Sequence, residues 1–192
     1  MTKLIVASNS PRRQELMAQA GFKFEVFTQD IDESIDNSMP ILDVAKFLAE
    51  KKNKEYRKLL SQEIIVTSDT VVIAKDQILG KPKNADEARS MLQSMSEGSH
   101  SVVTGVCISS DTKMVSFDDV TRVNFNRITL QEIDYYIEKY KPYDKAGAYG
   151  IQEWIGMVAI DKIEGSFYNV MGLPIHKVYG CLKNDFDISP LP

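Results

Sequence analysis

The sequence contains little cysteine and little histidine, and each shortage excludes a kind of site. Its two cysteines, Cys107 and Cys181, lie far apart without a CxxC spacing, which argues against a disulfide framework and against a thiolate zinc site. Such thiols are typical of a reducing compartment. Because His100 and His176 are the only histidines, an HExxH site is absent, and a Ser-His-Asp triad would have to use one of these two residues.

The chain also lacks a basic excess and a long hydrophobic run. Its 192 residues include 23 Lys and Arg against 27 Asp and Glu, a net charge of −4, whereas nonspecific binding to nucleic acids or anionic membranes requires basic charge. The apolar stretches are strand-sized, far shorter than the ~20 residues of a membrane span. The opening MTKLIVASNSPRR has its arginines after the apolar run, unlike a signal peptide. We expect a cytoplasmic protein without nucleic-acid or membrane partners, although a small anion fits the net charge.

The pattern of apolar residues and turn signals predicts a mixed α/β fold. With 43% apolar residues, a chain of this length forms one domain or two small lobes that share a core. The strands are expected at 3–7, 22–28, 64–68, 70–75, 77–79 and around 157–163, with a hairpin from 100–110 and 113–125. The helices are expected at 10–20, 40–60, after the capping pairs Asn84/Glu87 and Thr129/Glu132, and from Pro174.

A candidate phosphate-binding loop joins the first predicted strand to the first predicted helix. The segment SNSPRR contains Ser8, Arg12 and Arg13. Free backbone N–H groups and the helix dipole favour anions at such a position, and two guanidinium groups can bind phosphate oxygens. An ordinary capped surface helix whose arginines face water has the same local pattern, so this loop alone leaves both interpretations open.

Carboxylates follow two of the predicted strands. Asp30, Asp32 and Glu33 cluster after the second strand, and Asp69 follows the run IIVTS. The carboxyl ends of strands are where α/β folds place ligands, and two carboxylates brought together there would offer oxygen ligands to Mg²⁺ or Mn²⁺. A solvated acidic loop is the alternative for the first three residues, whereas an aspartate next to a buried strand needs a partner.

Two later segments carry a cation or an amide in a restrained backbone. Lys81 lies between Gly80 and Pro82, without the upstream glycine and the trailing Ser or Thr of a P-loop, which is rejected. The segment DKAGAYGIQ combines small residues with Lys145 and with Gln152, whose amide can read a base edge. A turn lysine and a structural turn packed on the sheet remain alternatives for these two segments.

Six motifs in one order resemble the Maf family of nucleoside triphosphate pyrophosphatases. They are SNSPRRQEL, SDTVV, GKP, SEGSHSVVTGV, DKAGAYGIQ and NVMGLP, within a resemblance from about Leu4 to Leu182. Each motif alone is weak, but their order over nearly the whole chain is specific. The resemblance implies a single Maf-like domain over 1–192 with a mixed sheet, two lobes and a central cleft, related to inosine triphosphate pyrophosphatases. It also implies a homodimer that converts a nucleoside triphosphate and water into a monophosphate and pyrophosphate.

The resemblance further implies catalytic roles for residues at matching positions. Asp69 matches the family's catalytic acidic residue, and Glu33, Lys52 and Lys81 match charged residues of the cleft. We therefore expect Asp69, Glu33 and Lys81 to be catalytic. Because Glu33 and Asp69 supply oxygen ligands and no histidine or cysteine cluster is present to hold zinc, we expect activity to require Mg²⁺, Mn²⁺ or Co²⁺.

Substrate binding is implied for a second group of residues. Ser8 and Arg13 match the loop that binds the triphosphate, and Arg12, Thr70 and Gln152 match positions tied to substrate choice; Lys52 and Lys145 complete the expected binding set. DKAGAYGIQ resembles the branch that acts on dTTP and UTP in a house-cleaning role, whereas the 7-methyl-GTP branch carries an AGSF-type segment. That second branch, and a non-catalytic regulator of cell division or septum formation, remain alternatives.

The sequence departs from the family pattern at two places. Glu153-Trp154 follows Gln152 where the family commonly has glycine, and Asn53 follows Lys52 where alanine is usual. The first departure leaves the loop geometry beside the predicted base site open.

Overall fold

Residues 3–36 and 38–191 are described by a computed structural model, which divides into two compact units. Unit 1 takes its residues from 1–69, 104–119 and 172–192, and unit 2 takes 70–103 and 120–171. The strands form a seven-stranded sheet in the order β2-β1-β3-β5-β6-β7, with β4 paired to β3. Parallel and antiparallel pairs both occur. The predicted α/β fold with a mixed sheet is confirmed, and the two units agree with the prediction of two lobes.

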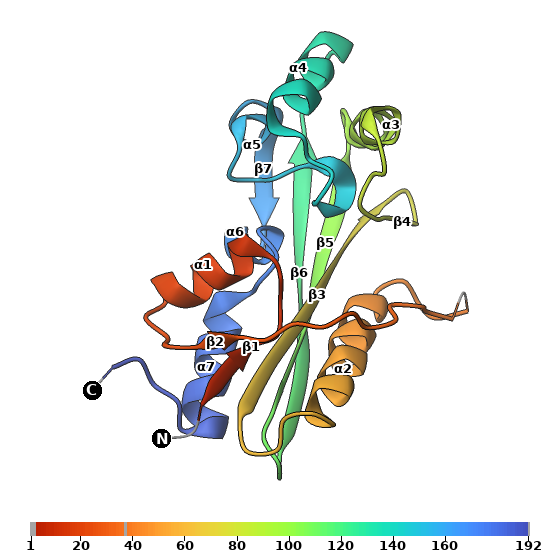
Figure 1. The fold of residues 1–192 in the computed structure, drawn as a ribbon. Coiled ribbons are helices and arrows are strands. Elements are labelled where there is room, and N and C mark those ends of the chain that lie inside the picture. Colours follow the sequence, from red (N-terminus) through yellow and green to blue (C-terminus); the bar gives the residue numbers. More distant parts are fainter. Residues whose placement is uncertain (1–2, 37, 192) are drawn as a thin grey trace. The chain divides into compact units, whose positions relative to one another are not determined.

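Figure 1 shows the elements in chain order. The strands are β1 (Leu4–Val6), β2 (Glu25–Val26), β3 (Ile64–Ala74), β4 (Gln77–Leu79), β5 (Ser99–Ser109), β6 (Met114–Phe125) and β7 (Ile160–Glu164). The helices are α1 (Pro11–Gln19), α2 (Val44–Arg57), α3 (Ala85–Met95), α4 (Leu130–Tyr140), the short 3₁₀ helix η1 (Ala146–Ala148), α5 (Trp154–Ala159), α6 (Phe167–Val170) and α7 (Ile175–Phe186).

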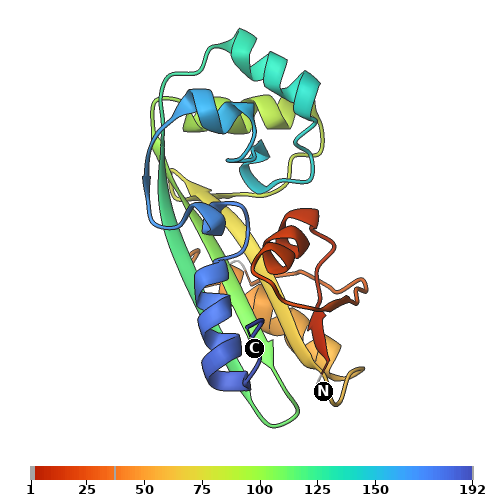
Figure 2. The same ribbon diagram turned by 90° about the vertical axis from the view of Figure 1, so that its left-hand side faces the viewer.

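Three of the strands in unit 1 are parallel to one another. β1 pairs on one side with β2 and on the other with β3, so that Ile5 lies opposite both Glu25 and Ile65. α1 connects β1 to β2, and α2 leads from β2 across β1 to β3. Because right-handed crossovers that run in opposite directions place their helices on opposite faces, α1 and α2 lie on the two sides of the sheet, as Figures 1 and 2 show.

Helix α2 packs directly against β3 and β5 in unit 1. A Cβ atom on Gly105 of β5 would lie 2.3 Å from the Cα of Lys46, so only glycine allows this approach. The Thr67 hydroxyl of β3 donates to the carbonyl of Ala49 at 2.7 Å. The buried Asn53 donates to the carbonyl of Cys107 at 3.1 Å and accepts from the Ser109 hydroxyl at 2.6 Å. These polar contacts fix the position of α2 along the sheet.

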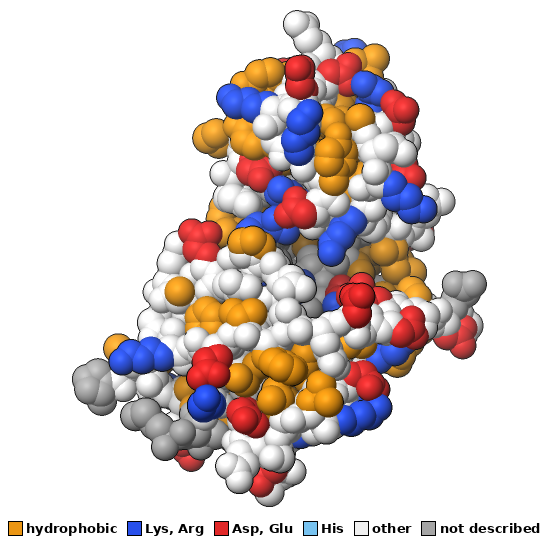
Figure 3. Space-filling model, viewed as in Figure 1, with side chains coloured by type: hydrophobic (Ala, Val, Ile, Leu, Met, Phe, Trp, Pro, Cys, Tyr) orange, Lys and Arg blue, Asp and Glu red, His pale blue; other side chains and the backbone are white. Residues whose placement is uncertain are grey.

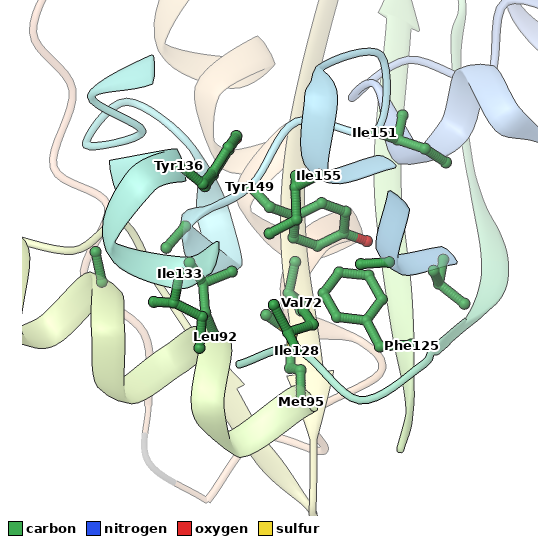
Figure 4. Packing of buried hydrophobic residues seen from close by; sticks show 14 of the residues in the cluster. Val72, Leu92, Met95, Phe125, Ile128, Ile133, Tyr136, Tyr149, Ile151 and Ile155 are labelled. Atoms are coloured by element: carbon green, nitrogen blue, oxygen red, sulfur yellow. The ribbon is translucent and has the colours of Figure 1, made fainter. Parts of the chain in front are cut away.

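Unit 2 encloses its own hydrophobic core, seen from close by in Figure 4. Leu92, Ile133 and Ile155, from α3, α4 and α5, are fully buried in it. Beside them, the rings of Phe125 and Tyr149 meet edge to face with centroids 5.0 Å apart. The capping residues Asn84 and Thr129 each accept a hydrogen bond from the predicted partner three residues later, which confirms both predicted helix starts.

Three strand predictions differ from the structure. The runs expected at 64–68 and 70–75 form one continuous strand, β3, so Asp69 lies within a strand and not beyond its end. The pairing of β3 with β1 ends at Val66, and its pairing with β4 begins at Val72, so different neighbours support its two halves. Strand β2 is only two residues long. The beginning of the stretch expected as strand around 157–163 belongs to α5, which ends at Ala159, and the rest forms β7, which starts at Ile160.

The surface in Figure 3 carries charges of both signs. Lys and Arg side chains lie interspersed with Asp and Glu on the face shown, together with scattered hydrophobic side chains. This mixture agrees with the small net charge of −4. Among the helices of the described residues, none has both the length and the apolar character that a membrane crossing requires.

Candidate active site

The loop that precedes α1 is held by hydrogen bonds within unit 1. The buried Ser8 hydroxyl accepts from the backbone N–H of Ser10 at 3.2 Å, and the carbonyl of Ser8 accepts from the Gln14 amide at 2.8 Å. The Asn9 side chain accepts from the Thr28 hydroxyl at 2.9 Å. The loop therefore has a defined shape before any anion binds, at the N-terminus of a nine-residue helix.

Arg13 ties this loop to two other segments of unit 1. Its Nε donates to the carbonyl of Gly172 at 2.8 Å, and its Nη1 donates to the carbonyl of Ser68 at 2.9 Å and to the Ser8 hydroxyl at 3.5 Å. Burial lowers the pKa of this guanidinium, and the nearby charge of Asp69 opposes that shift. Arg13 thus holds Ser68, the residue before Asp69, in a fixed position. Arg12 is half-buried on the same helix.

Two carboxylates and one ammonium form the charged centre of unit 1. Lys52 of α2 makes an ion pair with Glu33 through Nζ and Oε1 at 2.6 Å, and a second, short one with Asp69 of β3. The side chains of Lys52 and Asp69 are each 15% exposed and that of Glu33 is 57% exposed. The structure therefore brings together three of the residues that the sequence proposed for catalysis or binding.

The acidic segment that carries Glu33 lies along α2. The Tyr56 hydroxyl accepts from the backbone N–H of Gln29 at 3.1 Å. Lys51 pairs with Asp32 at 2.9 Å, and hydrogen bonds from Ser34 and Lys51 lower the pKa of Asp32 to about 2. Lys51 also donates to the carbonyl of Ser34 at 3.0 Å, so contacts on both sides of Glu33 hold the segment to the helix that presents Lys52. Asp30, which was in the same predicted cluster, is exposed.

The carboxylates of Glu33 and Asp69 fit a hard divalent cation. Together with Lys52 they carry two negative charges and one positive charge, and the charge of Arg13 also interacts with both carboxylates. The described residues contain no group of three or more histidine, cysteine or acidic side chains arranged to bind a metal. Mg²⁺ is commonly held by one or two carboxylates, with substrate phosphates and water as the other ligands. The donor set of Glu33 and Asp69 meets that requirement.

Unit 2 contains the other predicted site residues. Thr70 is half-buried in β3, and Lys81 is exposed after β4. The carbonyl of Gly80, just before Lys81, accepts from the backbone N–H of Gly147 at 3.1 Å. This bond joins the segment that carries Lys81 to the segment that carries Lys145 and Gln152.

Lys145 and Gln152 have opposite environments within their loop. The Gln152 side chain is exposed. The Lys145 side chain is only 9% exposed, and its ammonium pairs with Asp144 at 2.8 Å and with Glu153 at 3.2 Å. Two carboxylates of unit 2 therefore bind the ammonium of Lys145, whereas the Gln152 amide is accessible to solvent.

His100 and the two cysteines are buried and supply no competing nucleophile. His100 is buried, its Nε2 lies 2.7 Å from the Tyr149 hydroxyl, and burial lowers its pKa to about 4. Cys107 and Cys181 are free and buried, and burial raises the pKa of their thiols to about 12 and about 11. These thiols remain protonated at neutral pH.

One protein-family model matches almost the whole chain. The model of the family described as "Maf-like protein" matches residues 3–185. The chain belongs to the Maf family. This confirms the resemblance found in the six motifs, since the match covers nearly the whole sequence.

Curated relatives of this Maf chain are similar over almost their full length. A protein of Parabacteroides distasonis named dTTP/UTP pyrophosphatase is 46% identical over 184 residues, which cover 95% of each chain. A protein of Flavobacterium johnsoniae with the same name is 48% identical over 178 residues, which cover 92% of each chain. Among solved structures, a Ham1 protein of Staphylococcus aureus superposes with a TM-score of 0.46 and 12% identity over 65% of this chain and 72% of that chain.

The sequence did not reveal the contacts that support the site. In the sequence Asn53 is only a departure from the family pattern, yet in the structure it anchors α2 beside Lys52. Tyr136 carries no signal of a site in the sequence, because a tyrosine at helical spacing among apolar residues indicates a core position. The structure places its hydroxyl next to Glu153 and Gly150 in the loop that carries Gln152.

Proposed function

We propose that this Maf-family chain is a pyrophosphatase that hydrolyses dTTP and UTP, or modified pyrimidine nucleotides, to the monophosphate and pyrophosphate. The observation that carries the proposal is the cluster of Glu33, Lys52 and Asp69 beside the loop before α1. The names of relatives that are 46% and 48% identical support the same reaction and the same substrates. Removal of these nucleotides from the pool is a house-cleaning activity.

The residues of unit 1 perform the hydrolysis in this proposal. Asp69 accepts a proton from the attacking water, whose oxygen bonds to the α-phosphorus. The bond from this phosphorus to the oxygen that bridges to the β-phosphate breaks, and pyrophosphate leaves with that oxygen. Ser8, Arg12, Arg13 and Lys52 orient the triphosphate and offset the charge that develops on the leaving group.

Glu33 and Asp69 would hold a divalent ion, Mg²⁺, Mn²⁺ or Co²⁺. When bound, such an ion neutralises phosphate charge and lowers the pKa of a water that it coordinates. Since Lys52 already lies between these carboxylates, its ammonium is placed to move from a carboxylate to a phosphate oxygen when the ion and the nucleotide arrive.

The residues of unit 2 select the nucleotide. The exposed Gln152 amide offers a donor and an acceptor that match the O4 and N3–H groups of thymine and uracil. Thr70 of this unit and Arg12 of unit 1 support that choice, and Lys81 and Lys145 add positive charge for the phosphates. In this proposal the two units act on one nucleotide as a single Maf-like domain over residues 1–192.

The decisive experiment measures pyrophosphate release across a panel of dTTP, UTP, CTP, GTP and 7-methyl-GTP, with Mg²⁺ or with EDTA, and identifies the products by phosphorus NMR. We expect monophosphate and pyrophosphate, with dTTP and UTP as the best substrates. Orthophosphate and a diphosphate would reject the reaction. Faster turnover of 7-methyl-GTP would favour the other branch of the family. Nucleotide binding without turnover would favour a regulatory protein.

We also propose that the chain acts in the cytoplasm as a homodimer, without nucleic-acid or membrane partners. The family resemblance supports the dimer, and the net charge of −4 supports the absence of polyanionic partners. Sedimentation equilibrium at micromolar concentration should give twice the chain mass. A monomer mass at that concentration would contradict the proposed dimer.

A further inference from the structure

The loop of unit 2 that carries Gln152 contains a tight turn. The backbone N–H of Glu153 donates to the carbonyl of Gly150 at 3.0 Å, so Ile151 and Gln152 are the two central residues of a β-turn. Ile151 is buried and belongs to the hydrophobic cluster of unit 2 that Figure 4 shows. Gln152 is exposed. The core therefore anchors one central residue while the turn presents the other to solvent.

A single tyrosine hydroxyl bridges the two ends of this turn. The Tyr136 hydroxyl of α4 accepts from the backbone N–H of Gly150 at 3.0 Å and donates to Oε2 of Glu153 in a short hydrogen bond. Tyr136 is fully buried. Burial, followed by the hydrogen bond to Glu153, raises the pKa of this hydroxyl, so it keeps its proton and remains a donor to Glu153.

The carboxylate of Glu153 fits closely into the loop. A Cβ atom on Gly150 would lie 2.8 Å from the carboxyl carbon of Glu153, so the glycine leaves the space that the carboxylate occupies. The other carboxylate oxygen, Oε1, pairs with Lys145 at 3.2 Å. The side chain of Glu153 is only 17% exposed, and the ammonium of Lys145 offsets the cost of burying its charge.

We propose that Glu153 is a positioning residue for nucleotide selection: by joining Tyr136 and Lys145 it fixes the turn Gly150–Glu153 and thereby the direction of the Gln152 amide. The inference rests on the proposed function, because it assumes that Gln152 reads the base. Glu153 itself makes no contact with the nucleotide in this proposal. Its negative charge is neutralised within the loop by the ammonium of Lys145.

The test compares the variants Glu153→Ala, Glu153→Gln and Tyr136→Phe with two controls on α4. Tyr140→Phe removes a hydroxyl one turn away from Tyr136. The rings of Tyr136 and Tyr140 are stacked, with centroids 5.0 Å apart. Glu138→Ala removes an exposed carboxylate of the same helix. Thermal unfolding of each variant shows whether the fold is retained.

The first readout is the ratio of kcat/KM for dTTP to that for CTP. We expect Glu153→Ala to lower this ratio about tenfold, the scale of one base contact, mainly through a higher KM for dTTP, with kcat for CTP unchanged. Glu153→Gln should lower this ratio less, because the amide oxygen of the glutamine can still accept a hydrogen bond from Tyr136. Glu153→Gln and Tyr136→Phe should be non-additive in the double variant, because both act on one hydrogen bond. The two controls should keep the wild-type ratio.

The second readout does not depend on turnover. Trp154 is the single tryptophan and follows Glu153 directly, with its ring centroid 5.0 Å from that of Tyr135. Acrylamide should quench its fluorescence more strongly in Glu153→Ala and Tyr136→Phe than in the wild type. The inference would be overturned if the wild type cleaves dTTP while the folded Glu153→Ala variant keeps both the wild-type ratio of kcat/KM values and the wild-type quenching of Trp154. If the wild type leaves dTTP intact, the proposed function is rejected. In that case, unchanged quenching of Trp154 in Glu153→Ala and Tyr136→Phe would still overturn the positioning role of Glu153.

Discussion

The two units use charged side chains in opposite ways. In unit 1, Glu33 and Asp69 share the ammonium of Lys52, and this cluster retains an excess of negative charge that a cation can neutralise. In unit 2, Asp144 and Glu153 surround the ammonium of the buried Lys145, and the accessible group is the neutral amide of Gln152. A charged cluster suits phosphate hydrolysis, and a neutral amide on a rigid turn suits recognition of a base. Damage to the cluster of Glu33, Lys52 and Asp69 should therefore slow every substrate, whereas damage to the turn that carries Gln152 should change the ranking of substrates.

Removal of divalent metal should have the largest effect. With EDTA in excess, turnover of dTTP, UTP and CTP should all fall to background, because the carboxylates of Glu33 and Asp69 lose the ion that neutralises the phosphates. Addition of Mg²⁺ should restore the rates. Full activity in EDTA, after elemental analysis shows that no metal remains, would contradict the proposed requirement for a divalent ion.

Asp69→Asn should be nearly as severe. The substitution keeps the shape of the side chain but removes its charge, and a positioned acid or base contributes a factor of roughly 10² to 10⁴. Steady-state kinetics should show this loss in kcat for pyrimidine and purine substrates alike, with their ratio unchanged. Near wild-type turnover in the folded variant would dismiss Asp69 as the catalytic group.

The free energy of unfolding should depend on pH through His100, a buried residue of unit 2. Burial lowers its pKa to about 4 from 6.5, so between these values the unfolded chain binds a proton that the folded chain does not. Stability should therefore fall as pH drops through this window, by up to about 3 kcal/mol from this residue. Urea unfolding at pH 7 and pH 4.5 should show a smaller difference for His100→Gln than for the wild type. Equal differences would contradict the shift.

Asn53→Ala should affect unit 1 through both stability and catalysis. The change leaves the Ser109 hydroxyl and the carbonyls of Ile65 and Cys107 without the Asn53 amide, at a cost of about 2 kcal/mol for unsatisfied buried groups. Because Asn53 follows Lys52 on α2, kcat should fall for all nucleotides together. Unchanged urea unfolding would show that Asn53 does not anchor the helix.

Gln152→Ala should have the smallest effect on rate and the most selective one. Loss of one base contact costs about 1 to 3 kcal/mol, so kcat/KM should fall about tenfold or more for dTTP and UTP and less for CTP and GTP. Kinetics over the four nucleotides give the comparison. An equal fall for all four would show that Gln152 does not read the base.

Local signals in the sequence determined a large part of the fold. The capping residues Asn84 and Thr129 and the Ser10-Pro11 pair predicted the starts of three helices, because a helix N-terminus is satisfied by residues within a few positions. The order of six motifs identified the family, which the match over residues 3–185 confirmed. Most candidate site residues could be named for the same reason, since the motifs contain them, whereas Glu33 and Lys52 lie outside the six motifs and were matched by position alone.

Only the tertiary structure decided which of these residues act on one another. The continuity of β3 through Asp69 depends on its neighbours in the sheet, β1, β4 and β5, which come from other parts of the chain. The ion pairs of Lys52 join residues from a loop, a helix and a strand, and the Tyr136 hydroxyl bridges a turn 14 to 17 positions along the chain. Local sequence patterns report contacts within a helix turn or a strand pair, whereas these contacts form only when distant segments fold together.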